Sequence, residues 1–167
     1  MGNRINETIS ALSCGIIHPP LGARILLRKI MDGIPGLSID WTSRVEDLRK
    51  LTDKGFDGVL LYIHRQDISD TSLKALDYFS ARGGGILALH SATASFKTRQ
   101  AYSDILSGRF SGHGPVNSFT VHPKGRGRFR DLGAFTVRDE LYHHDISGDI
   151  DILYTAKDGS GEYPRNK

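Results

Sequence analysis

Along the first hundred residues, the spacing of apolar positions alternates between that of strands and that of helices. Four short apolar or alternating runs predict strands, at residues 8–14, 37–41, 58–63 and 86–89. Between them, wider apolar spacing predicts three helices, at residues 23–31, 42–51 and 70–82. Strands that alternate with helices indicate a parallel sheet with helices on both faces, of the flavodoxin-like or Rossmann-like kind.

Two of the predicted helices carry apolar stripes that we expect to face a core. In the first helix, after a loop that holds two prolines, the stripe consists of Ile25, Leu26, Ile30 and Met31. In the third helix it consists of Leu73, Leu76, Tyr78 and Phe79. Side-chain oxygens can cap the second helix from Thr42 or Ser43, and the third from Asp67, Ser69 or Asp70.

The run from Gly83 to Ala92 is the stretch around which the chain is organised. Its apolar residues, 86–89, predict a strand buried on both faces, and the small residues after it allow a sharp turn. Such an elbow lifts one side chain above the carboxyl edge of an open sheet, here His90 with Ser91 beside it. Because imidazole titrates near neutral pH, His90 is a candidate general base. The alternative is a structural histidine bonded to the backbone.

The second half of the chain has a less regular pattern. We expect a short helix at residues 102–106, a glycine-rich loop at 108–115, and strands at 116–122, 135–137 and 150–154. The stretch 139–145 is rich in ionisable residues. If it is extended, Glu140, Tyr142 and His144 share one face and His143 lies on the other, so only one of the two histidines is expected to face a pocket. Carboxylate and imidazole can share acid and base roles; the alternative is a solvated loop.

Composition narrows the class of protein. The 167 residues suffice for one domain with a real core, and the net charge of +3 does not argue for a nucleic acid or a membrane surface. The basic stretch Lys124–Arg130 reads as a solvated loop. Cys14 is the single cysteine, which favours a reducing compartment, and no apolar run is long enough to cross a bilayer. We therefore expect a cytoplasmic protein with no nucleic-acid or membrane partner.

A divalent metal is an open alternative. Imidazole and carboxylate ligands suit zinc, iron or manganese, and the candidates are His18, His90, His113, Glu140 and His143. No pair among them has a standard ligand spacing on a helix, so the sequence does not commit to a metal. Arg109 could bind hydroxyls or an anion, although most arginines simply solvate a surface.

Several short motifs follow one another between residues 55 and 155. They are Gly84–Ser91, Tyr102, Gly108–Phe110, Gly112–His113, His122–Pro123, Phe135–Val137 and Asp139–His143. In this order they resemble the trehalose-utilisation (ThuA-like) family. In the front third of the chain, His18 after the first strand is the best match.

The resemblance implies a fold similar to that of class I glutamine amidotransferases, a flavodoxin-like three-layer α/β/α sandwich with a mostly parallel sheet. Those enzymes carry a nucleophilic cysteine at the elbow, where this chain has His90, so glutamine amidotransferase activity is not expected. Members of the ThuA-like family are associated with the catabolism of trehalose and related disaccharides, with 3-keto sugars as intermediates.

The leading hypothesis is a sugar bound at the carboxyl edge of the sheet. His90 and Glu140 would act as acid and base on a keto sugar, in an isomerase, lyase or hydrolase reaction. The residues expected to bind the substrate are His18, Ser91, Arg109, His113, Tyr142 and His143. The alternatives are a non-catalytic sugar-binding or assembly module and a metal-dependent hydrolase.

Family members usually continue beyond the strand at 150–154 with a further strand, a helix and a Gly-His pair. We therefore expect a single ThuA-like domain over residues 1–167 that lacks its C-terminal part. The loss of an edge element would leave apolar surface exposed, which predicts a homo-oligomer.

Overall fold

The computed structural model describes residues 6–15, 20–124, 132–158, 161–163 and 165–166, with side chains up to residue 156. The chain divides into two compact units, Met1–Leu106 and Ser107–Lys167, and each is described by itself. The expected single domain of residues 1–167 stays a prediction. None of the helices in the described ranges is long and apolar enough to cross a lipid bilayer.

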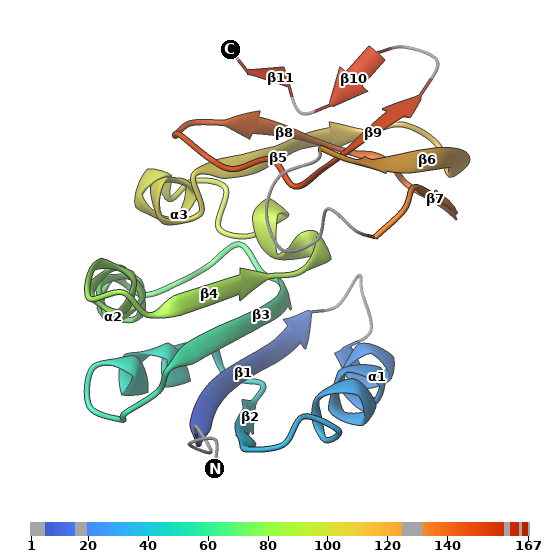
Figure 1. Ribbon diagram of the computed structural model, residues 1–167. Helices are drawn as coiled ribbons and strands as arrows, with labels where there is room; N and C mark the ends of the chain where they lie inside the picture. Colours follow the sequence, from blue (N-terminus) through green and yellow to red (C-terminus); the bar gives the residue numbers. More distant parts are fainter. Residues whose placement is uncertain (1–5, 16–19, 125–131, 159–160, 164, 167) are drawn as a thin grey trace. The chain divides into compact units, whose positions relative to one another are not determined.

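The first unit is built on a four-stranded parallel sheet (Figure 1). Its strands are β1 (Glu7–Gly15), β2 (Leu37–Thr42), β3 (Gly58–His64) and β4 (Gly85–Ala88), in the order β2-β1-β3-β4. The chain passes from β1 to β2 on one side and then crosses to β3 on the other. The carboxyl ends of β1 and β3 are therefore the switch point of the sheet, where open α/β sheets bind their ligands.

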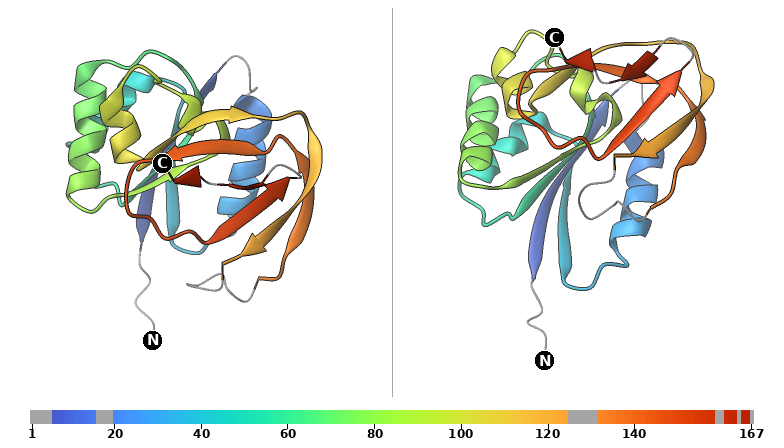
Figure 2. Two further views of the ribbon diagram at one scale, coloured as in Figure 1. Left: turned by 90° about the horizontal axis from the view of Figure 1, so that it is seen from above. Right: turned by 45° about the horizontal axis from the view of Figure 1, so that its top comes forward.

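Helices cover both faces of this sheet (Figures 1 and 2). Helix α1 (Pro20–Met31) lies on one face, and α2 (Asp70–Ala81) and α3 (Gln100–Ile105) lie on the other. The 3₁₀ helix η1 (Val45–Leu51) packs against α2, and a second one, η2 (His90–Ala94), follows β4. This arrangement confirms the predicted flavodoxin-like three-layer α/β/α fold.

The core of the first unit fills the space between the sheet and the layer of α2, α3 and η1. Alternate residues of β3 point into it, so Val59, Leu61 and Ile63 are each almost completely buried. They meet η1, α2 and the segment after the elbow through Leu48, Leu51, Leu76, Phe79, Phe96 and Tyr102. The segment after the elbow is thus packed into the same core as α2 and η1.

Helix α1 differs from its prediction at its start and on its apolar face. It begins at Pro20, because proline is well suited to the first helical position, whereas the sequence placed this residue in the loop. Ile25, Leu26 and Ile30 were expected in the core, but they are 58–61% exposed. The helix instead rests on the sheet by its other side, where the Arg24 guanidinium lies 5.3 Å from the centre of the Trp41 ring.

Helix α2 follows its prediction at most positions. Ser69 is the N-cap and accepts a hydrogen bond from the Ser72 amide. Leu73, Leu76 and Phe79 are buried, but Tyr78 is 57% exposed. It lies beside Arg82 rather than in the core.

The cap predicted for the second helix is wrong. η1 begins after Arg44 without a side-chain cap. Thr42 instead donates a hydrogen bond to the Asp47 carboxylate.

The prediction that β4 is buried on both faces is wrong. It is an edge of the four-stranded sheet, and Leu87 is 53% exposed. Ile86 and Ala88 are partly buried and pack against the core from the opposite face. The apolar run therefore corresponds to a strand covered on one side.

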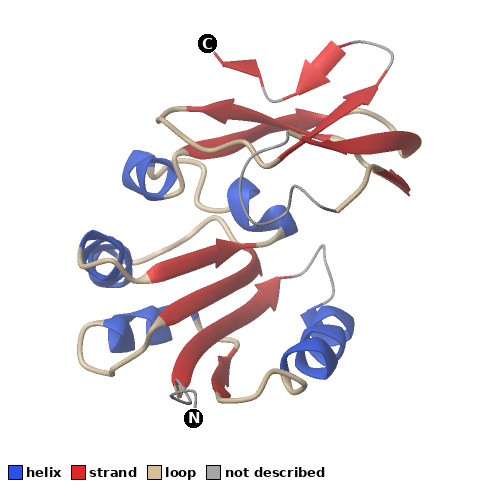
Figure 3. Ribbon diagram, viewed as in Figure 1, coloured by secondary structure: helices blue, strands red, loops and turns tan. Residues whose placement is uncertain are grey.

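The elements described in the second unit are all strands (Figure 3). One sheet has the order β11-β8-β5, from Arg165–Asn166, Tyr142–Ile146 and Gly108–His113. The other has the order β10-β9-β6-β7, from Gly161–Tyr163, Tyr154–Asp158, Asn117–Pro123 and Phe135–Asp139. The expected glycine-rich loop at 108–115 is thus largely a strand. The strand expected at 150–154 begins only at Tyr154.

Candidate functional site

His90 stands at the elbow after β4, as the sequence predicts. It is the first residue of η2 and has a φ of 53°, in the left-handed region that non-glycine residues rarely adopt. Such a conformation costs on the order of 1 kcal/mol or more and persists only where the surroundings enforce it. The imidazole is exposed and stacks on Tyr62 of β3, with ring centres 6.3 Å apart and planes 22° from parallel.

The elbow is held from beneath by buried hydrogen bonds. The hydroxyls of Ser91 and Ser95 both donate to the carbonyl of Ile63, at 2.9 and 3.1 Å. The Tyr102 hydroxyl donates to the carbonyl of Ala92 at 3.0 Å, and burial raises the pKa of this phenol well above its ordinary value. These bonds pin the turn to β3 and α3. In this geometry Ser91 supports His90 from within the core, while its predicted contact with a substrate stays a prediction.

In the second unit, a bulge in β5 gathers aromatic side chains on one face. Phe110 pairs with His144 of β8, but the register then shifts so that Gly112 faces His143 and His113 faces Tyr142. Residues 110 and 113 would point to opposite faces of a regular strand; the extra residue brings them to the same one. The rings of Phe110 and His113 are 5.9 Å apart, and those of Phe110 and Tyr142 are 4.7 Å apart.

His113 and Glu140 are neighbours on this unit. The Nδ1 atom of His113 lies 2.8 Å from the carbonyl oxygen of Gly114 and 3.8 Å from Oε1 of Glu140. Since a carbonyl can only accept, Nδ1 donates to it, which leaves Nε2 as the basic nitrogen of the neutral ring. The contact with Glu140 is therefore an electrostatic one between partly exposed groups. Arg109 lies 3.6 Å from the carboxylate of Asp145, its partner across the strands.

A cavity of about 240 Å³ lies beside the aromatic face, within the second unit. It is lined by Val121, Leu141, Tyr142, His144, Ile146, Tyr154, Thr155 and Ala156. Burial, and after it the charge of neighbouring His143, lowers the pKa of His144. Of the two histidines it is thus His144 that lines a cavity. The sequence analysis placed His144 on the same face as Tyr142 but chose His143 as the substrate-binding residue.

The candidate residues fall into separate groups. His90 and Ser91 belong to the first unit, and Arg109, His113, Glu140, Tyr142 and His143 belong to the second. His18 lies outside the described residues, as do most positions of the predicted basic loop at 124–130. Within the part of the chain that the structure describes, no three histidine, cysteine, aspartate or glutamate side chains are grouped closely enough to hold a metal ion.

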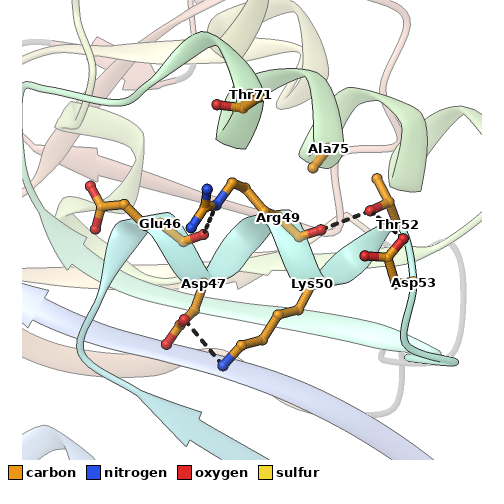
Figure 4. A pocket seen from close by; sticks show the side chains of 8 residues that line it. All are labelled: Glu46, Asp47, Arg49, Lys50, Thr52, Asp53, Thr71 and Ala75. Atoms are coloured by element: carbon orange, nitrogen blue, oxygen red, sulfur yellow. Dashed lines mark hydrogen bonds and ion pairs between the residues drawn. The ribbon is translucent and has the colours of Figure 1, made fainter.

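A charged pocket of about 430 Å³ lies between η1 and α2 (Figure 4). Two of its basic side chains bind groups of the same 3₁₀ helix: Lys50 lies 3.1 Å from the Asp47 carboxylate, and Nε of Arg49 donates to the backbone carbonyl of Glu46. Arg49 and Lys50 are thus both engaged within the wall of the pocket. We assign it no ligand.

Comparison with known proteins places the fold. No family model and no curated protein matches the sequence. Among solved structures, a protein from Bacteroides uniformis described as ThuA-like superimposes with a TM-score of 0.78 over 98% of this chain and 78% of its own. A second protein with that description, from Parabacteroides merdae, gives 0.73 over 90% of this chain and 67% of its own. The fold of this chain is ThuA-like.

The two structures support the family resemblance indicated by the motifs. They share only 13% and 15% sequence identity with this chain, so the likeness is one of backbone and not of side chains. The chemistry of this chain therefore depends on its own side chains.

Proposed function

We propose that this chain is a ThuA-like protein of carbohydrate catabolism that binds a sugar, such as a 3-keto derivative of trehalose, at the carboxyl edge of the parallel sheet. His90 is the acid–base group of the proposed site and takes a proton from a carbon next to the keto group or from a hydroxyl. Tyr62 offers an aromatic surface beside it. Glu140, next to His113 in the second unit, is the predicted second acid–base group.

The observation that supports the proposal is the strained conformation of His90. Glycine adopts positive φ freely, so the protein would be more stable with glycine at this position. The chain instead places an exposed imidazole there, stacked on Tyr62 and supported by the buried bonds of Ser91 and Ser95. Residues held in rare backbone regions cluster at functional sites, where the surrounding structure enforces them.

The test is a comparison of two substitutions of His90. His90→Gly relieves the backbone strain, so the protein should become more stable by about 1 kcal/mol. Binding of trehalose or of its 3-keto derivative, measured by calorimetry, should nevertheless weaken, and turnover followed by NMR should be lost. His90→Ala should also lose turnover, without the gain in stability.

His122→Ala is the matched control, because it removes another exposed imidazole, on β6, to which no role is assigned. It should leave binding and turnover unchanged. Sugar binding without turnover in the unmodified protein would instead favour a non-catalytic binding module. Full turnover in His90→Ala would refute the role of His90, and Glu140→Gln would then test whether the second unit carries the chemistry alone.

A further inference from the structure

A second pocket, of about 390 Å³, lies where β2 and β3 end. It is lined by Ser43, Arg44, Val45, Glu46, Arg65 and Asp67. Ser43 and Arg44 directly follow the last residue of β2, and Arg65 directly follows that of β3. In a parallel sheet these ends share one edge, so the pocket opens at the carboxyl edge of the first unit.

Arg65 also marks the switch point of the sheet. It follows β3, and its guanidinium lies close enough to Cys14, near the carboxyl end of β1, to act on the pKa of that thiol. Burial raises the pKa of this thiol, and the nearby guanidinium opposes the rise. Arg65 therefore lies near the carboxyl ends of both β3 and β1, at the point where open α/β sheets bind ligands.

The backbone on both sides of the pocket is fixed. The Arg65 amide donates to the Ser95 hydroxyl at 3.2 Å, and the Arg65 carbonyl accepts from the Phe96 amide at 2.8 Å. On the other side, the Arg44 amide donates to the Thr42 hydroxyl at 3.1 Å. Both arginines are thus mounted on ordered backbone, which keeps the entropic cost of binding a ligand between them low.

The charges of the two arginines are not neutralised by ion pairs. Among the residues that the structure describes, no ion pair includes Arg44 or Arg65. Glu46 and Asp67 also line the pocket, but neither lies within ion-pair distance of a guanidinium. The pocket is therefore lined by two arginines and a serine, whose side chains can donate hydrogen bonds, and by two acidic residues, whose side chains can accept them.

We propose that this pocket binds a small hydroxylated phosphate ester. Arg44 and Arg65 hold the phosphate, because the planar guanidinium matches two phosphate oxygens at once, and Ser43 donates a further hydrogen bond. Glu46 and Asp67 accept hydrogen bonds from the hydroxyl groups of the same ligand. The assignment does not depend on the proposed sugar chemistry, since His90 does not line this pocket.

The experiment is a titration of the full chain with glycerol 3-phosphate. Glycerol and acetate are the comparison ligands, and binding is monitored by calorimetry and by amide chemical shifts. Glycerol 3-phosphate should bind more tightly than either and shift the amides of residues 43–46 and 65–67. Arg65→Ala and Arg44→Ala should each weaken binding at least about tenfold, as expected for the loss of a charge-assisted pair. Arg65→Lys should weaken it less than Arg65→Ala, because it keeps the charge without the fork.

Arg49→Ala is the matched control. It also removes a positive charge, but Arg49 lies on η1 and lines the other pocket (Figure 4). It should bind glycerol 3-phosphate as the unmodified chain does. Equal losses in all three alanine variants would mean non-specific attraction to positive charge and would overturn the proposal. Absence of binding, or acetate bound more tightly than the phosphate ester, would overturn it as well.

Discussion

Gly84→Ala offers a sharp test of how the turn before β4 packs against α2. A Cβ atom at this position would lie 2.3, 2.4 and 2.6 Å from three carbons of the Phe79 ring, which is completely buried. Carbon atoms in contact normally lie about 3.5–4.0 Å apart, so the ring would have to retreat by on the order of 1 Å into a close-packed core. The added methyl therefore acts as overpacking.

The expected loss follows from two opposing effects. Overpacking costs about 1–3 kcal/mol, and the lower entropy of the unfolded chain with alanine returns about 0.4–1 kcal/mol of that. We expect Gly84→Ala to destabilise the protein by about 1–2 kcal/mol, seen in urea unfolding as a lower midpoint with an unchanged slope.

Two further variants make this test specific. Gly85→Ala is the neighbouring control: its Cβ would meet only the Asp57 carbonyl at 3.8 Å, an ordinary contact, so little or no loss is expected. Phe79→Leu removes the ring that causes the clash, and Gly84→Ala should cost much less in that background than alone. The reasoning fails if Gly84→Ala is as stable as the unmodified protein, or if its cost is the same in both backgrounds.

Three other outcomes are expected. Ser69→Ala removes the N-cap bond to the Ser72 amide and should lower the free energy of unfolding by about 1 kcal/mol in chemical denaturation. An unchanged free energy would show that α2 does not depend on this cap. Tyr102→Phe loses the buried bond to the Ala92 carbonyl and should lower the unfolding free energy by about 1 kcal/mol; an unchanged value would contradict the anchoring of the elbow. The pKa of His144 is lowered in the folded state, so the unfolded chain binds the proton more readily. Stability should therefore fall as the pH drops below 6.5, and His144→Gln should remove that part of the slope.

The parallel sheet and the elbow could be predicted because they depend on local signals and on few connection rules. Each apolar run of the first hundred residues became a strand of one sheet, and the alternation with helices left few topologies. The turn after β4 could be predicted because small residues follow a polar pair. The positive φ of His90 could not be predicted, since histidine rarely adopts one.

What covers an apolar face could not be predicted. Periodicity shows that Leu26 and Ile30 share a side of a helix, but not that this side would remain exposed, and it likewise missed the exposure of Leu87 on an edge strand. The bulge in β5 was hidden for another reason: a run rich in glycine reads as a loop. His113 joins the aromatic face around Phe110 only because of that bulge.

Helix α1 has no buried side chain along its twelve residues, and this sets it apart in the first unit. A helix of this length is marginal without tertiary support, and α1 is supported only by half-buried side chains and by the Trp41 contact. β1 and β2 pair directly with each other, so the sheet need not separate when α1 unwinds. In native-state hydrogen exchange, the amides of α1 should open as a unit of their own, at a free energy well below that at which the β1–β3 ladder exchanges.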